Sequence, residues 1–232
     1  LQNINMFPNP FVAASPLGDV IAVWVQDDLA KTYPRSFEVY YSTFDPAANT
    51  WRTPSPVTND GLIQDSPVVE FDGNGNAIAV WNTAKDETVT TAVDPQSLVG
   101  KGLSEIAYSI WNRTSRTWSA ETLLTNNNLE DHTPRLVRDE NGDIMLIWLR
   151  NEDPNNLLAN AIYASTWNGR GWSPEARVVA NVPTSSLPHA AYHFGKALVV
   201  WPQHMDGNFT TKEDVELFAS AFDGSTWGAP SR

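Results

Sequence analysis

The chain has 232 residues, a formal net charge of −12 and a pI near 4.6. Nucleic-acid binding needs a basic face that replaces counterions, so this composition argues against a nucleic-acid partner, and it disfavours an anionic membrane surface for the same reason. The longest uninterrupted apolar run, IMLIWL, is far shorter than a membrane span, so we expect no membrane insertion. Cysteine is absent, which excludes disulfides and thiolate metal sites.

Short apolar segments and polar turns alternate along the chain, without the i, i+3, i+4, i+7 spacing of a surface helix. The stretch from Ser66 to Leu124 shows the pattern best. Two apolar segments flank Asn74-Gly75, which suits the two positive-φ positions of a two-residue hairpin. A third strand is predicted from Glu105 to Trp111 and a fourth from Trp118. Four short antiparallel strands in about sixty residues make one propeller blade.

The same unit occurs four times, over residues 9–60, 66–125, 133–180 and 187–232, and 1–232 is treated as one unit. The first strand and its turn carry Pro10/Gly18, Pro67/Gly75, Pro134/Gly142 and Pro188/Gly195. The second strand ends at Trp24, Trp81, Trp148 and Trp201. The third holds Ser42, Ser109, Ser165 and Ser220. The fourth opens at Trp51, Trp118, Trp172 and Trp227, and we expect all eight tryptophans to pack between blades.

The second strand is apolar at nearly every position, as in IAVW, so both of its faces must be buried. A propeller meets this condition because each blade is packed between two neighbours, whereas an open one-sided sheet would alternate. We therefore predict an all-β fold, a β-propeller of four-stranded antiparallel blades with four blade repeats in this chain. Two arrangements stay open: a closed four-bladed ring, or part of a larger propeller.

The turn between the third and fourth strands has the form Ser-x-aromatic-Asp/Asn, then a short polar turn and Trp. The last copy, SAFDGSTW from Ser220 to Trp227, resembles the Asp-box of sialidase-like propellers, the bacterial neuraminidase repeat. Ser220, Gly224, Thr226 and Trp227 match that motif, whereas Asp223 stands one place later and the other copies are looser. The resemblance implies four-stranded blades in a secreted or cell-surface protein. In that family the box is a structural turn, so it implies nothing about catalysis.

The sequence nominates no catalytic residues. Sialidases of that family bind the substrate carboxylate with three arginines and carry an Arg-Ile-Pro-type signature, which is absent here. Arg135, Arg138 and Arg150 do not occupy matching columns. A glycosidase needs two carboxylates about 5 to 9 Å apart, and the 27 acidic residues single out no pair. His189 and His193 lie four apart on a predicted strand, without the glutamate of a zinc-protease helix.

The loops between the second and third strands are long and variable, which favours function at that end of the blades. Acidic residues in these loops follow the second-strand tryptophans by three to six residues, so blades around one axis would bring them to one rim. Grouped carboxylates hold Ca²⁺ or accept hydrogen bonds from sugars; a solvated acidic face is the alternative. The candidate ligand-binding residues are Asp27, Asp28, Asp86, Glu87, Glu152, Asp153, His204 and Asp206.

The sequence favours a non-catalytic binding or assembly module that recognises glycan or a protein partner through the long-loop face. One alternative is part of a glycan-active, sialidase-like hydrolase, and another is a structural repeat of a surface layer or filament. Self-assembly, or packing against further blades of a parent protein, fits the repeats. The acidic loops suggest calcium at the rim and no other cofactor. Asn112 and Asn208 stand in glycosylation sequons.

Overall fold

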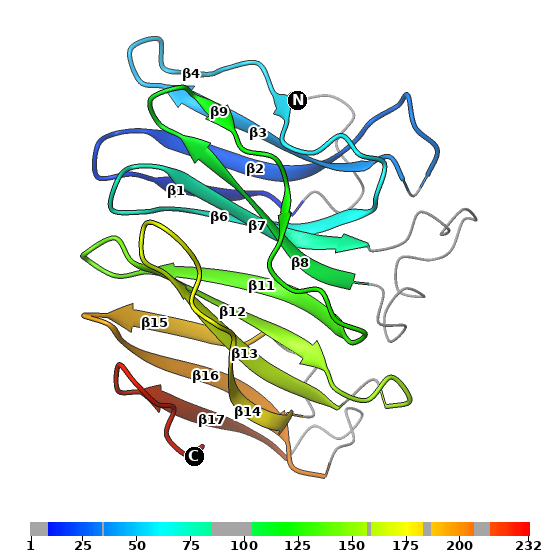
Figure 1. Cartoon of the computed structure of the whole chain (residues 1–232), viewed down its shortest axis with the longest axis vertical. Helices are drawn as coiled ribbons and strands as arrows, with labels where there is room; N and C mark the ends of the chain where they lie inside the picture. Colours follow the sequence, from blue (N-terminus) through cyan, green and yellow to red (C-terminus); the bar gives the residue numbers. More distant parts are fainter. Residues whose placement is uncertain (1–8, 34, 85–103, 157–158, 183–186, 207–213) are drawn as a thin grey trace.

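The computed structural model of the chain describes residues 9–33, 35–84, 104–156, 159–182, 187–206 and 214–232. Within them the regular secondary structure is all β-strand, in four antiparallel sheets stacked from one end of the molecule to the other (Figure 1). This part of the chain has no helix that is long and apolar enough to cross a membrane. The predicted all-β class with four blade-like sheets is confirmed.

Each sheet is one repeat, and we number the blades 1 to 4 in chain order. Blade 1 contains β1 (Phe11–Ala14), β2 (Val20–Asp27), β3 (Phe37–Asp45), β4 (Thr50–Trp51) and β5 (Ser55–Pro56). Blade 2 contains β6 (Gln64–Phe71), β7 (Ala77–Ala84), β8 (Ser104–Asn112), β9 (Thr117–Trp118) and β10 (Thr122–Leu123). Blade 3 contains β11 (Glu130–Arg138), β12 (Ile144–Asn151), β13 (Asn160–Trp167) and β14 (Ala176–Val182). Blade 4 contains β15 (His189–His193), β16 (Lys196–His204) and β17 (Val215–Phe222), with single bridges from Trp227 and Ser231 in place of a fourth strand.

The blades form an open stack. First strands of neighbouring blades contact one another, β1 with β6, β6 with β11 and β11 with β15, so these strands form the inner edge of the stack. Figure 1 shows blade 1 and blade 4 at opposite ends of the molecule. The closed four-bladed ring, one of the two arrangements that the sequence left open, is therefore not the arrangement seen in the described residues.

Burial of the second strands follows from this stacking. Every residue of β12 is buried, as predicted for a strand packed on both faces. In β16 the prediction is wrong, because burial alternates and Leu198 is 46% exposed; Leu217 of the neighbouring strand β17 is 64% exposed. The second-strand tryptophans Trp24, Trp81, Trp148 and Trp201 are all buried, as expected. The fourth-strand tryptophans are partly buried, and Trp118 and Trp172 contact tyrosines of the preceding blade, as expected for packing between blades, whereas Trp51 is 45% exposed, so the expectation is wrong for Trp51.

The repeated serine fastens the third strand to the start of the fourth. Its buried hydroxyl donates to the carbonyl of the residue after the fourth-strand tryptophan. The four bonds are Ser42 to Arg52 (2.6 Å), Ser109 to Ser119 (2.8 Å), Ser165 to Ser173 (2.7 Å) and Ser220 to Gly228 (2.8 Å). In the turn between these strands, one side-chain Oδ1 in every blade accepts hydrogen bonds from two backbone N–H groups. The accepting residues are Asp45, Asn112, Asn168 and Asp223. The Asp-box-like turn is thus a structural element in all four copies.

The turn between the first and second strands differs from the predicted two-residue hairpin. In blade 2 only Gly75 has a positive φ (79°), whereas Asn74 does not. Asp72 closes the turn instead, because its Oδ1 accepts the backbone N–H groups of Asn74 and Asn76, both at 2.9 Å. Gly75 N also donates to Asp72 O at 3.0 Å, as in a type I turn followed by one left-handed residue.

Buried polar groups at the long-loop end differ from blade to blade. The indole N–H of Trp24 donates to Gln26, and that of Trp201 to Gln203. In blade 2 the matching position is Thr83, which is too short to reach Trp81. Glu121 lies beside Trp81 instead, although its geometry falls short of a hydrogen bond. Burial raises the pKa of Glu121 to about 7; the charges of Asp60 and Glu38 add to this rise, and the indole opposes it.

Among the described glycines, Gly142 has the least space for a side chain. Its φ is +86°, and an added Cβ would lie 2.2 Å from the Cα of Gly73 in the preceding blade. The N–H of Gly73 donates to Gly142 O at 3.0 Å. We expect Gly142→Ala to destabilise by roughly 2 to 4 kcal/mol, from backbone strain plus a steric clash. The control is Gly18→Ala, with φ +89° and open space around the Cβ, at about 1 kcal/mol. Equal losses in thermal melting would contradict the clash.

The buried carboxyl of Glu121 predicts a pH-dependent stability. Its pKa in the folded state is raised, so its protonated form stabilises the fold fully below about pH 4.5, and this contribution is lost as the pH rises through about 7. Glu121→Gln should match the wild type at pH 4 and exceed it at pH 8 by on the order of 1 to 2 kcal/mol, after discounting for solvent screening. Denaturant unfolding at both pH values is the measurement. Glu175→Gln, in the same column of blade 3, should instead destabilise, because Glu175 accepts two hydrogen bonds from Arg150 at 2.7 Å.

Candidate functional site

The structure places the described rim candidates at the long-loop end, where the second strands finish. Asp27 ends β2, Glu152 directly follows β12 and His204 ends β16. Asp28, Asp153 and Asp206 stand in the loops that follow. Asp86 and Glu87 lie outside the described residues, as does Asn208. The other sequon residue, Asn112, is exposed in the short turn at the opposite end.

Each of the described rim candidates makes a polar contact within its own blade. Asp27 accepts from Ser36 at 2.9 Å, and Asp28 pairs with Lys31 at 3.6 Å. Glu152 accepts from Tyr163 at 2.7 Å and pairs with Arg177 at 3.3 Å. Asp153 caps its own loop, His204 lies 3.5 Å from Asp214, and the backbone N–H of Asp206 donates to Asp214 at 2.9 Å. Among the described residues no three His, Asp or Glu side chains come together to hold a metal ion, so a ligand role for this rim stays a proposal.

A second group of polar residues lies at the inner edge of the same end, where β6 and β11 begin. Both strands contain a register shift, between Asp65 and Val68 and between His132 and Arg135. Within each shift one residue before a proline has a positive φ, Ser66 at 51° and Thr133 at 59°. A residue before proline normally avoids such a conformation, and bulges of this kind re-aim side chains next to functional sites.

We call Asp65, Ser66, Asn82, His132 and Thr133 the inner-strand mouth. Asp65 is exposed, accepts from Ser66 Oγ at 3.1 Å and is the cross-strand partner of Asn82. Asn82 Oδ1 accepts the backbone N–H of Thr133 at 3.1 Å, which joins blade 2 to blade 3. The Thr133 hydroxyl bonds to His132 Nδ1, and His132 Nε2 lies 3.4 Å from Asn160 Oδ1. These contacts link Asn82 of blade 2 to Thr133, His132 and Asn160 of blade 3, and Asp65 and Ser66 lie on the strand beside Asn82.

Burial sets the protonation state of the mouth. It lowers the pKa of His132, against the opposing effects of Asn160 and Asp131, so the imidazole is neutral at pH 7. Because Asn160 Oδ1 is an acceptor, Nε2 carries the proton and Nδ1 accepts from the Thr133 hydroxyl. Burial also lowers the pKa of Arg135, whose Nη1 donates to Pro134 O at 3.3 Å.

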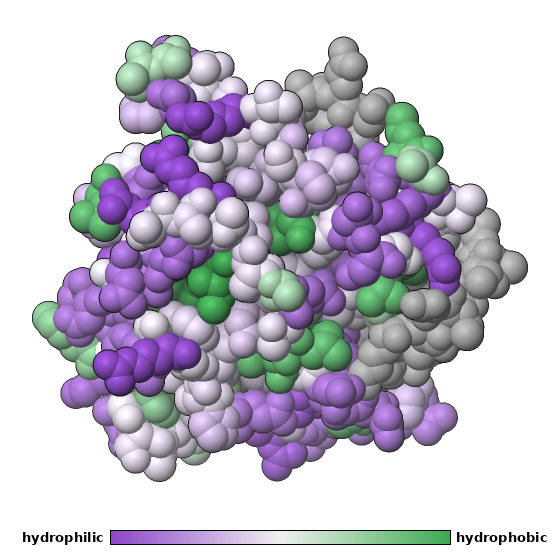
Figure 2. Space-filling model, turned by 45° about the horizontal axis from the view of Figure 1, so that its top comes forward, coloured by the Kyte–Doolittle hydropathy of each residue, from purple (hydrophilic) through white to green (hydrophobic). Residues whose placement is uncertain are grey.

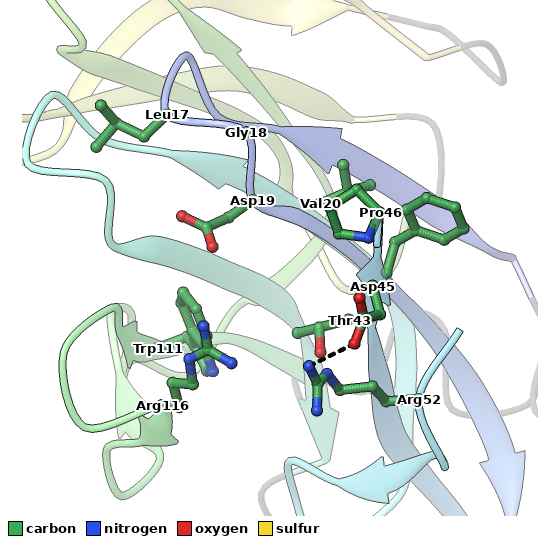
Figure 3. Close-up of a pocket in the computed structure, with 11 residues that line it drawn as sticks. Leu17, Gly18, Asp19, Val20, Thr43, Asp45, Pro46, Arg52, Trp111 and Arg116 are labelled. Atoms are coloured by element: carbon green, nitrogen blue, oxygen red, sulfur yellow. Dashed lines mark hydrogen bonds and ion pairs between the residues drawn. The ribbon is translucent and has the colours of Figure 1, made fainter. Parts of the chain in front are cut away.

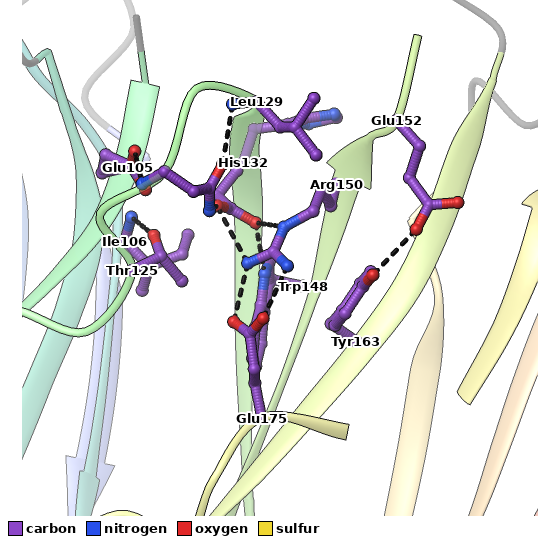
Figure 4. A network of polar contacts seen from close by, with 12 residues as sticks. Glu105, Ile106, Thr125, Leu129, His132, Trp148, Arg150, Glu152, Tyr163 and Glu175 are labelled. Carbon is purple, nitrogen blue, oxygen red and sulfur yellow. Dashed lines mark hydrogen bonds and ion pairs between the residues drawn. The ribbon is translucent and has the colours of Figure 1, made fainter. Parts of the chain in front are cut away.

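A buried ion-pair network supports the mouth from below (Figure 4). Arg150 Nε donates to Asp131 Oδ1 at 2.7 Å, and its two terminal nitrogens reach Glu175 on the fourth-strand side of the blade. Asp131 also accepts from Trp148 Nε1 at 2.6 Å and from Asn127 at 2.7 Å. The guanidinium carbon stands 4.1 Å from the ring centre of Tyr163. With both oxygens occupied and no exposure, Asp131 does not reach the surface of the mouth.

The mouth therefore offers hydroxyls, an amide, a neutral imidazole and one exposed carboxylate. Hydrolysis of a glycosidic bond needs two carboxylates that reach the substrate, and of Asp65 and Asp131 only Asp65 is exposed. Sequence reasoning missed these residues, although it noted the repeated proline column. The sequence feature that could have found them is the position directly before the repeated proline. Ser66 precedes Pro67 and Thr133 precedes Pro134, and the register shifts include these residues.

No protein-family model and no curated protein matches the sequence. Solved structures do match it in fold. "Hadza microbial sialidase Hz136" superimposes with a TM-score of 0.67 at 12% identity, over 95% of this chain and 45% of that one. The intramolecular trans-sialidase from Ruminococcus gnavus gives a TM-score of 0.59 at 10% identity, over 99% and 71%. The α-L-arabinanase of Penicillium chrysogenum gives 0.53 at 13%, over 93% and 62%.

The chain thus spans from under one half to about two thirds of the length of these neighbours. Identities this low show the fold alone. The superpositions confirm the likeness in fold that the Asp-box-like turns indicated. The described chain has the fold of sialidase and related glycoside hydrolase β-propellers.

Proposed function

We propose that the chain is a non-catalytic binding module that recognises carbohydrate through its long-loop end, with the inner-strand mouth as the contact surface. The chemistry of the mouth supports this most. Sugar hydroxyls both donate and accept hydrogen bonds, and they match the hydroxyl, amide, imidazole and carboxylate groups of the mouth. On the face in view, Figure 2 shows hydrophilic residues over most of the surface and apolar residues in small separate patches, which suits a polar ligand.

The acidic rim is proposed as the outer part of the same surface. Asp27, Glu152 and Asp206 stand at the same end as the mouth, each on a different blade. Their carboxylates would accept hydrogen bonds from the hydroxyls of a longer glycan. The rim residues form ion pairs with exposed partners such as Arg177. Surface ion pairs of this kind are weak, so they exchange readily for a ligand.

A second candidate function is that the chain is part of a glycan-active hydrolase. The share of Hz136 that it covers, 45%, favours this, since a larger propeller would carry further blades. Those blades would supply the second carboxylate that the described mouth lacks. The mouth would then be one wall of an active site.

The turn resemblance supports a secreted or cell-surface location, and that location is part of the proposal. A protein partner on the long-loop face is the alternative ligand. Self-assembly through the exposed outer face of blade 4, with Leu198 and Leu217, is the alternative role. Measurement of the native particle mass together with glycan binding separates these outcomes.

The test is binding of wild type and variants to an array of neutral and acidic oligosaccharides, followed by titration of the best binder. Asp65→Asn and Thr133→Gly should each weaken binding by about 10-fold or more. Thr133→Gly should leave stability equal or higher by up to about 1 kcal/mol, because glycine relieves the left-handed φ. Combined changes of Asp27, Asp86 and Asp206 to Asn with Glu152→Gln test the rim.

The matched control is Asp223→Asn, because asparagine fills the same turn position at Asn112 and Asn168. It should keep both the fold and the binding. Loss of binding in Asp223→Asn, with the mouth and rim variants unaltered, would place function at the short-turn end instead. Release of sugar from a bound oligosaccharide by the wild type would favour the hydrolase.

A further inference from the structure

A polar pocket lies at the short-turn end, away from the mouth, between blades 1 and 2 (Figure 3). It has a volume of about 280 Å³. The turn between β1 and β2 forms one wall, the turn after β3 another, and the turn after β8 the third. Trp111, which is 2% exposed, forms the floor, and the exposed Leu17 and Pro46 form an apolar lip.

The charges around the pocket do not cancel. Asp45 pairs with Arg52 at 2.8 Å, and Asp19 pairs with Arg113 at 2.6 Å. Arg116 also lines the pocket, and within the described residues its guanidinium has no hydrogen-bond or ion-pair partner. Arg113 stands outside the lining but takes up the charge of Asp19, so three arginines face two aspartates around the pocket, in a protein whose formal net charge is −12. Figure 3 shows Arg52 and Arg116 reaching the pocket from the two different blades.

The backbone at Arg116 is strained in a way that the turn does not require. Its φ is +56°, a conformation that costs a non-glycine residue roughly 1 to 2 kcal/mol. Asn49 holds the same place in the turn of blade 1, with φ +52°, and asparagine tolerates that region well. The turn therefore accepts a better-suited residue, and the arginine side chain is what position 116 adds. Strained residues of this kind mark functional positions.

The geometry points to an anion-binding site in this pocket, with Arg116 as the principal ligand and Arg52 as the second. The ligand class is a carboxylate or sulfate group, which a guanidinium binds through two parallel N–H bonds. The apolar lip of Leu17 and Pro46 would take the carbon skeleton that carries the group. This site is independent of carbohydrate recognition at the mouth, because it uses other residues at the opposite end.

The experiment is titration of the wild type with sodium sulfate, sodium glucuronate and a glucuronate-terminated oligosaccharide, at constant ionic strength and followed by tryptophan fluorescence. We expect saturable binding, and Arg116→Asn should weaken it by about 10- to 100-fold, the worth of a charged hydrogen-bond pair. Its melting temperature should be equal or higher, since asparagine suits the left-handed turn. Tight binding of sulfate alone identifies a free-anion site, and preference for the oligosaccharide identifies an acidic-sugar site.

The matched control is Arg170→Asn. Arg170 stands two residues before Trp172, as Arg116 stands before Trp118, but it lines no part of this pocket. It should bind the anions as the wild type does. The inference is overturned by the absence of saturable binding in the wild type, by full binding in Arg116→Asn, or by equal losses in Arg116→Asn and Arg170→Asn.

Discussion

The serine-to-carbonyl hydrogen bond in each blade is the interaction on which the stack depends. In blades 1 and 2 the strands at the fourth-strand tryptophan are very short, β4 and β9 having two residues each, and in blades 3 and 4 that tryptophan makes a single bridge, so the sheet ladder alone holds this segment weakly. The buried serine and the Oδ1-capped turn fix the start of that strand instead. They thereby position Trp118 against Tyr41 and Trp172 against Tyr108 of the preceding blade, with ring centres 5.4 and 6.0 Å apart. One local bond thus determines a contact between blades.

The two ends of the blades obey different rules. At the short-turn end all four repeats use the same serine and the same Asp or Asn cap. At the long-loop end the residue two places after the buried tryptophan varies between Gln26, Thr83, Arg150 and Gln203, and the indole N–H donates to that glutamine in blades 1 and 4 but to Asp131 in blade 3. In blade 3 the arginine brings a buried ion-pair network, whose value lies in orienting its neighbours more than in stability. Variation at a fixed position of the framework is what a ligand-facing end needs.

The repeat determined how much could be predicted from sequence. The serine and second-strand tryptophan columns report local spacing and burial, so they identified the second and third strands of all four sheets. The hairpin at Asn74-Gly75 was mispredicted because the Asp72 side chain competes with the two-residue turn for the same N–H groups. Burial of β16 was mispredicted because it depends on what lies beyond blade 4, and local pattern carries no such information. The mouth was missed because bulges at Ser66 and Thr133 turn side chains away from simple alternation.

Left-handed residues other than glycine and asparagine show where the fold gives up stability for a side chain. The structure has four in its described part: Ser66, Arg116, Thr133 and Phe194. The backbone N–H groups of Thr133 and Phe194 donate to the side chains of Asn82 and Glu140 in a neighbouring blade, which offsets part of the strain. Arg116 gains only the N–H bond of its own turn, to Asn112 O at 2.7 Å. No contact with another blade therefore offsets the strain of its backbone. A bound anion is the partner whose interaction with this arginine would offset that strain.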